Sequence, residues 1–373
     1  MKKTKEFIFK IFLVALLLYM FLLSIGLMGA AFKGFGREFA ENLIRTTSNP
    51  FVGLFIGILA TSLVQSSSTT TSIVVGIVGS GGMAVGNAIP IIMGANIGTT
   101  VTNTLVSLGH VSRREEFKRA ISAATVHDFF NLICVTILFP LELTTGFLEK
   151  CATAMSGVFE NAGGIKLVSP IKVATAPVVH FIQNIIQALI KSPTAIHIVM
   201  LVLSFLILFF ALYFIVKIMK SLVVQRAEII LNNVLNRSRL AGFAAGLAFT
   251  TIVQSSSITT SLLVPMVAAG IFSVKSAFPI TLGANIGTTG TAILASFATG
   301  NPSAITVAFV HFLFNLTGIL CIYPIKIFRR IPIKLAQELG ELAARKRRYA
   351  LFYVIGVFFL LPALLIFIYR LFC

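Results

Sequence analysis

The stretch QSSSTTTS at residues 65–72 places eight consecutive residues with hydroxyl or amide groups inside a strongly apolar chain of 373 residues. A nearly identical stretch, QSSSITTS, stands at residues 254–261. A helix that crosses a bilayer needs about 20 predominantly apolar residues, so a polar run of this kind requires an explanation. Its repetition indicates that the same explanation applies to two parts of the chain.

The composition predicts an all-α polytopic membrane protein. Apolar residues make up 57% of the chain and charged residues only 11%, and the mean hydropathy is +0.97, whereas about a quarter of the residues of a soluble protein are charged. Apolar runs at 7–32, 196–216 and 349–369 each have about the length of a bilayer span. The first run is longer than the apolar core of a secretory signal, which favours an uncleaved first span.

The two polar stretches belong to a longer internal repeat. A shift of 189 residues superimposes 65–100 on 254–289 with 21 of 36 positions identical, including GANIGTT at the end of both segments. Further along, VHDFFN at 126–131 corresponds to VHFLFN at 310–315. Identity at this level without gaps indicates that the chain contains two copies of one structural unit.

The basic residues predict that the two copies face opposite ways through the membrane. RREEFKR at 113–119 carries four basic residues, whereas the equivalent segment of the second copy, 298–303, carries none. Placing 1–5, 113–119, 217–239 and 326–348 in the cytoplasm gathers 20 of the 30 Lys and Arg residues there. The N-terminus is then cytoplasmic and the C-terminus outside. The alternative is a parallel duplication in a structural membrane protein.

The expected fold consists of two inverted-topology repeats with re-entrant helical hairpins and broken helices. Some 65 residues separate the loop near residue 45 from that at 113, too few for three spans, so QSSS is expected in a re-entrant hairpin and GANIGTT in a span. The glycines of GANIGTT are expected to let the helices unwind. The predicted parts are 1–45, a first span and outer loop; 46–148, the first repeat; 149–239, an outer amphipathic segment, a connecting span and a cytoplasmic loop; 240–325, the second repeat; and 326–373, a basic cytoplasmic loop and the last span.

The repeat cores favour a site for an anion and cations together. Residues 65–100 contain no Lys, Arg, His, Asp or Glu, and 254–289 contain only Lys275. Hydroxyl, amide and backbone oxygens are ligands for a small alkali cation, while hydroxyls, amide NH2 groups and helix N-termini donate to a tetrahedral oxyanion. Without a basic residue, the anion charge must be balanced by cations that bind with it. This is the logic of a symporter.

Two His–Asn pairs accompany the repeats. His127 with Asn131, and His311 with Asn315, are four residues apart and share a helix face. We expect them to orient the hairpins by hydrogen bonds, with a proton-linked step as the alternative. Asp128 has no counterpart in the second copy. The four cysteines form no CxxC pair and predict neither a disulfide framework nor a transition-metal site.

Four segments resemble the type II sodium-dependent phosphate cotransporter family: QSSSTTTSIVV, AIPIIMGANIGTTVTNT, RREEFKRAISAATVHDFFN and LFPLELTTGFLEK. The resemblance implies sodium-driven uptake of inorganic phosphate across the cell membrane, with sodium as the coupling ion and no cofactor. The residues that it places at phosphate are Ser66, Ser67, Ser68, Ser255, Ser256, Ser257, Thr100 and Thr289. Those that it places at sodium are Gln65, Gln254, Asn96, Asn285, Thr99 and Thr288. The division of these residues between the two ions is an assumption.

Other functions remain as alternatives at this stage. The same fold could carry another oxyanion, such as arsenate, sulfate or a phosphonate. A membrane-embedded enzyme is disfavoured because the chain has no G-x-S-x-G or HExxH motif, and a channel has no need of two occluding hairpins. The basic charge lies between spans, which argues against a nucleic-acid partner. The expected partners are phosphate, sodium and the lipid bilayer, and the oligomeric state, for example a homodimer, stays open.

Overall fold

The computed structural model describes residues 2–36, 41–42, 47–161, 164–235 and 238–372. Every regular element in these ranges is helical. Six helical stretches are long and apolar enough to cross a membrane: Lys5–Gly34, Val85–Leu108, Arg114–Thr145, Pro193–Leu222, Pro302–Ile322 and Arg348–Tyr369. The prediction of an all-α polytopic membrane protein is confirmed.

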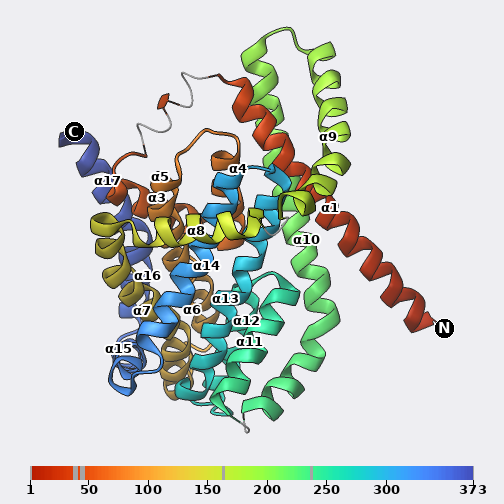
Figure 1. The fold of residues 1–373 in the computed structure, drawn as a ribbon. Helices are drawn as coiled ribbons and strands as arrows, with labels where there is room; N and C mark the ends of the chain where they lie inside the picture. Colours follow the sequence, from red (N-terminus) through yellow and green to blue (C-terminus); the bar gives the residue numbers. More distant parts are fainter. Residues whose placement is uncertain (1, 37–40, 43–46, 162–163, 236–237, 373) are drawn as a thin grey trace.

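The helices follow one another along the chain as Figure 1 shows. The first half contains α1 (Lys2–Gly34), α3 (Pro50–Val64), α4 (Ser67–Gly79), α5 (Val85–Gly98), α6 (Val101–Leu108), α7 (Arg114–Thr145) and α8 (Phe147–Asn161). The second half contains α9 (Gly164–Leu189), α10 (Pro193–Leu235), α11 (Arg239–Val253), α12 (Ser256–Ala268), α13 (Val274–Thr299), α14 (Pro302–Ile322), α15 (Lys326–Arg345), α16 (Arg348–Ile355), a π-helical turn (Gly356–Leu360) and α17 (Leu361–Phe372).

Both QSSS stretches break a helix at the same place. Gln65 ends α3 and Gln254 ends α11, each in the left-handed region with φ of 57° and 58°, and they are the only non-glycine residues with positive φ among those described. Ser66 and Ser255 follow in extended conformation, and α4 and α12 begin one residue later. A left-handed residue with a Cβ costs about 1 kcal/mol or more, and such strain concentrates at functional sites.

The first glycine of each GANIGTT serves close helix packing. A Cβ added to Gly94 in α5 would fall on the carbonyl oxygen of Leu54 in α3, and one on Gly57 would fall on the backbone of α5. In the second copy, Gly283 and Gly246 hold the backbones of α13 and α11 together in the same way. Membrane helices use small residues at such interfaces because only they let two backbones approach.

The expected unwinding of both GANIGTT segments is wrong for the second copy. Asn285 lies inside α13, which runs without interruption from Val274 to Thr299. In the first copy Asn96 is also helical, and the chain departs from the helix only at Thr99 and Thr100, between α5 and α6. Because the glycines have neighbouring backbones to contact on a helix face, they stabilise packing rather than a local break.

Each QSSS break joins two helices, α3 to α4 and α11 to α12, and we call each pair a hairpin with the break at its tip. The turns that follow these two hairpins lie at opposite ends of the bundle (Figure 1). At one end, the Asn301 side chain donates to the carbonyl oxygen of Gly79, at the end of α4, over 2.9 Å. At the other end, Arg119 at the start of α7 donates to the carbonyl oxygen of Ala268, at the end of α12, over 2.8 Å. The helices α4 and α12 therefore run from the QSSS breaks towards opposite ends of the bundle.

One apolar core holds the two halves together. Phe130 from α7, Phe278 from α13 and Phe314 from α14 are fully buried in it. The rings of Phe130 and Phe278 meet edge to face, with 5.9 Å between their centroids. The two copies thus share a core, and that core fixes the relative position of their hairpin tips.

Candidate functional site

The site begins where the two hairpin tips meet. Ser68, in the first turn of α4, donates its hydroxyl to the carbonyl oxygen of Gln254 over 3.3 Å. The same hydroxyl lies 3.1 Å from the Thr288 hydroxyl in α13. The structure therefore brings three of the residues singled out by sequence, from the two repeats, into direct contact.

Each break also sets two helix ends side by side. The N-terminus of α4 is capped by Ser66, whose hydroxyl oxygen accepts from the backbone N–H of Thr69 over 3.2 Å. The other N–H groups of that first turn have no hydrogen-bond partner within their helix. The last carbonyl groups of α3 likewise have no partner within theirs. A helix N-terminus carries partial positive charge and a C-terminus partial negative charge. An anion and a cation are thus both favoured next to the same break.

A chain of hydrogen bonds among buried His and Asn side chains joins the two repeats. His127 and Asn285 share a short hydrogen bond between Nε2 and Oδ1. Asn285 donates Nδ2 to Oδ1 of Asn131 over 3.1 Å, and Asn131 donates to the backbone oxygen of Asn96 over 2.8 Å. Asn315 donates to Oδ1 of Asn96 over 3.2 Å. Since the Asn285 amide nitrogen is already a donor to Asn131, its oxygen accepts, and His127 Nε2 carries the proton in this arrangement.

The network is not symmetric. His311, the counterpart of His127, is fully buried, and within the described part of the chain neither of its ring nitrogens has a hydrogen-bond partner. The hydroxyl of Ser256, at the start of α12, is equally buried and without a partner there. A buried polar group without a partner costs free energy, which points to a ligand, a water or another conformation that satisfies it.

The remaining predicted residues are placed near the breaks but bond mostly within their own helices. The hydroxyls of Thr99, Thr100 and Thr289 donate to the carbonyl oxygens of Ala95, Ile97 and Ile286 over 2.9, 2.8 and 2.7 Å. Ser67 is buried as the first residue of α4. Ser255 caps α12, and Ser257 is half-buried behind it. Gln65 is exposed at the tip of the first hairpin.

Sequence reasoning missed Asn103. Its Oδ1 in α6 accepts from the hydroxyls of Thr260 and Ser261 in α12 over 2.8 and 3.1 Å, so it ties the second hairpin to the first repeat. Asn103 corresponds to Ala292 in the second copy, so the repeat comparison gave no signal for it. Its position in VTNT, directly after GANIGTT, was the available clue.

Asp128 also gains a partner that the sequence did not indicate. The hydroxyl of Tyr353, in α16, donates to its Oδ2 over 3.0 Å. The carboxylate is fully buried beside Thr100, and its other oxygen, Oδ1, has no hydrogen-bond partner among the described residues. The only Asp of the chain therefore lies at the end of the first GANIGTT segment.

A helical bundle with several membrane-spanning helices and a buried polar centre beside interrupted helices is an arrangement that membrane transporters use. The family model described as Na+/Pi-cotransporter matches residues 20–158 and 207–322, and the chain belongs to this family. Its members are transporters and not enzymes.

Curated relatives agree with this assignment. Sodium-dependent phosphate transport protein 2B from Pongo abelii is 37% identical, and that from Homo sapiens 36%; each match covers 92% of this chain and 63% of the relative. Sodium-dependent phosphate transport protein 2A from Rattus norvegicus is 35% identical over 93% of this chain and 66% of the relative. The chain thus spans just under two thirds of the length of these relatives. No solved structure matches the chain.

Proposed function

We propose that this protein carries inorganic phosphate into the cell together with sodium, and binds both between the two hairpin tips. The observation that carries the proposal is the contact of Ser68 with Gln254 and Thr288, which joins the two charge-free QSSS segments into one polar centre. The names of the relatives, sodium-dependent phosphate transport proteins, favour phosphate as the anion and sodium as the cation.

In this proposal the first turns of α4 and α12 bind phosphate. Ser67 and Ser256 are buried at these helix N-termini, where hydroxyl and backbone N–H groups donate to an anion. The carbonyl oxygens that end α3 and α11, with the side-chain oxygens of Asn96, Thr99 and their counterparts, bind sodium. Because no basic side chain is present in 65–72 or 254–261, the sodium ions neutralise the phosphate with which they travel.

The asymmetry of the network supports alternating access by two inverted repeats. Ser68 donates a hydrogen bond to Gln254, whereas no hydrogen bond joins the corresponding residues Ser257 and Gln65 in the described structure. If the repeats are related by an in-plane two-fold axis, exchanging their conformations yields a second state that opens to the other side. In that state His311 bonds to Asn96, and the His127 bond to Asn285 is lost.

The charge distribution supports the proposed orientation. Lys118 and Glu341 form an ion pair of 2.7 Å, which puts the basic segments 113–119 and 326–348 at one end of the bundle. The beginning of α11 lies at the same end, and α17 lies towards the other (Figure 1). In our proposal the protein lies in the cell membrane with its basic end in the cytoplasm. The N-terminus is then inside and the C-terminus outside.

Labelling of single cysteines tests this orientation. In a variant whose four native cysteines are replaced, Ser112→Cys and Pro302→Cys introduce exposed thiols at the corresponding loops of the two repeats. We expect an impermeant maleimide to label the cysteine at 302 in intact cells and the one at 112 only in inside-out vesicles. Labelling of both from one side contradicts inverted repeats.

Transport itself is tested with purified protein in proteoliposomes. We expect uptake of labelled phosphate when sodium is higher outside, and uptake at the background level when potassium replaces sodium. Unlabelled arsenate should compete, because a hydroxyl-lined site has no group that excludes it by shape. Uptake that does not require sodium, or preferential uptake of sulfate, contradicts the proposal.

A further inference from the structure

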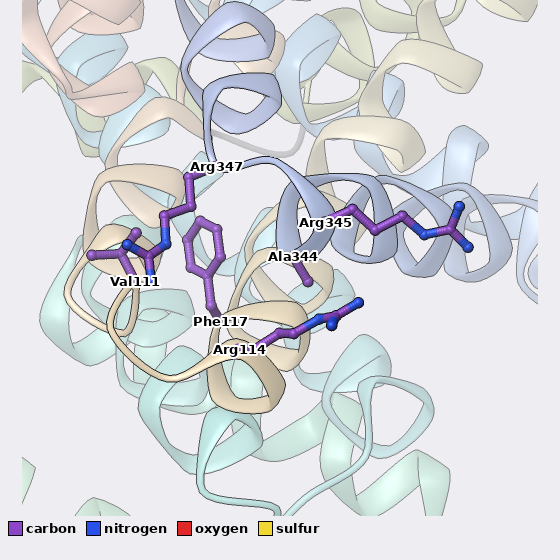
Figure 2. A pocket seen from close by; sticks show the side chains of 6 residues that line it. All are labelled: Val111, Arg114, Phe117, Ala344, Arg345 and Arg347. Atoms are coloured by element: carbon purple, nitrogen blue, oxygen red, sulfur yellow. The ribbon is translucent and has the colours of Figure 1, made fainter.

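A pocket away from the polar centre lies at the basic end of the bundle. It has a volume of about 640 Å³ and opens where the α6–α7 connection meets the end of α15. Figure 2 shows its six lining residues, Val111, Arg114, Phe117, Ala344, Arg345 and Arg347. The volume lies in the range of small-molecule sites, and half of the lining side chains carry a positive charge.

The three arginines of this pocket are not neutralised by the protein. Among the described residues, Arg114, Arg345 and Arg347 form no ion pair. The nearby carboxylates have other partners: Glu116 binds Arg113 over 2.7 Å, and Glu341 binds Lys118 over 2.7 Å. Lys118, and more weakly Arg345, hold the pKa of Glu341 below its usual value. Glu115 is not among the lining residues. The pocket thus has an unbalanced positive charge.

Two of the arginines are placed to bind a phosphoryl group, and the third adds positive charge at the rim. Arg114 and Arg345 extend to the same side of the pocket, whereas the guanidinium of Arg347 lies beside Val111 on the other side of the Phe117 ring (Figure 2). A guanidinium presents a planar fork of N–H groups that binds phosphate oxygens in pairs, so arginines are suited to phosphate esters. Val111, Phe117 and Ala344 provide an apolar wall behind the charges.

The surroundings of the pocket fit a lipid rather than a free anion. One face of α15, including Ala336, Gly340 and Ala343, is buried, and Gly340 packs directly against α7. Large apolar side chains beside the arginines remain exposed, including Leu342 and Phe352 at 48% and 62%. Basic and apolar groups combined on one surface are typical of helices that lie at the membrane interface.

We propose that this pocket binds the phosphate headgroup of an anionic phospholipid, with its acyl chains along the exposed apolar side chains of α15 and α16. Clusters of Lys and Arg at the ends of membrane helices attract anionic headgroups, and each basic residue contributes about fivefold in affinity. Three arginines correspond to roughly a hundredfold. This site is separate from the polar centre, so it does not depend on the transported substrate.

Native mass spectrometry of the full-length protein in neutral detergent tests the proposal. The probe is phosphatidylglycerol, with the zwitterionic phosphatidylcholine, which has no net charge, as the reference. The triple variant combines Arg114→Gln, Arg345→Gln and Arg347→Gln. It should bind phosphatidylglycerol about a hundredfold more weakly than the unmodified protein, whereas each single substitution should weaken binding about fivefold. The unmodified protein should prefer phosphatidylglycerol to phosphatidylcholine.

The matched control removes the same amount of charge from α15 outside the pocket: Lys326→Gln, Arg330→Gln, Lys334→Gln. Lys334 precedes Arg345 by about 16 Å along a helix that rises 1.5 Å per residue, roughly twice the screening length at physiological salt. We expect this control variant to bind phosphatidylglycerol at most a few-fold more weakly than the unmodified protein. An equal loss in the two triple variants, or equal binding of both lipids, overturns the proposal.

Two further measurements keep the result unambiguous. Millimolar inorganic phosphate should not displace phosphatidylglycerol, and displacement would show that the pocket takes the free anion instead and overturn the lipid assignment. The single variant Arg345→Gln, at the exposed end of α15, provides a folded protein should the triple variant not fold. Lipid binding is measured without transport, so failure of this proposal and failure of the proposed function are distinguishable.

Discussion

Replacing Ser256 with alanine is expected to weaken the apparent affinity for phosphate by roughly 10- to 100-fold. The Ser256 hydroxyl is buried in the first turn of α12 and has no hydrogen-bond partner among the described residues, so the substitution removes no bond that holds the fold. A hydrogen bond to a charged group contributes about 1.5–3 kcal/mol, which corresponds to this range. The measurement is the phosphate dependence of sodium-driven uptake into proteoliposomes.

Ser72→Ala is the matched control for this experiment. The Ser72 hydroxyl is also buried and without a partner in the described structure, but it lies five residues after Ser67, beyond the tip of the first hairpin. We expect its effect on phosphate affinity to be less than about twofold, because Ser72 lies more than one helical turn after Ser67, away from the helix N-terminus where phosphate is proposed to bind. Equal effects of the two substitutions, or unfolding of Ser256→Ala, would favour a packing role for these serines.

Replacing Gly283 with alanine is expected to lower the free energy of unfolding by about 3 kcal/mol and to reduce the yield of folded protein. The added Cβ falls on the carbonyl oxygen of Phe243, a backbone atom that cannot move aside as a side chain would. Overpacking of this kind costs about 1–3 kcal/mol, and a clash with backbone lies at the upper end. The measurement is the thermal midpoint of the purified protein.

Gly157→Ala controls for the change of residue type. No atom lies within 4 Å of the Cβ that it would add, and Gly157 is in the interior of α8. Alanine is the better helix former by about 1 kcal/mol, so this variant should be as stable as the unmodified protein or more stable. A similar loss in both variants would mean that the α11–α13 contact is not the cause.

Several features could be predicted from sequence because they depend on local patterns. Hydropathy over about 20 residues identified the spans at 7–32, 196–216 and 349–369, and each coincides with a long apolar helix. Identity at 21 of 36 aligned positions identified the duplication. The repeat also paired the two QSSS segments, and the structure interrupts a helix at the same residue of each, Gln65 and Gln254.

Other features could not be predicted because they depend on contacts between distant segments. The identical GANIGTT sequences end in a break after α5 but continue as helix in α13, so local sequence does not decide between the two. The partnership of Asp128 with Tyr353 joins residues 225 positions apart. The arginine pocket likewise combines residues 111–117 with 344–347.

The sequence alone determined that this chain is a membrane protein with two related polar hairpins, because solvent preference and similarity are properties of the residues themselves. The tertiary structure decided which of the equivalent groups are partnered. His127 and His311 stand in nearly the same local sequence, yet His127 bonds to Asn285, and His311 has no bond in the described structure. The physical reason is that a buried hydrogen bond requires its partner within about 3 Å, and only the packing of one repeat against the other sets that distance.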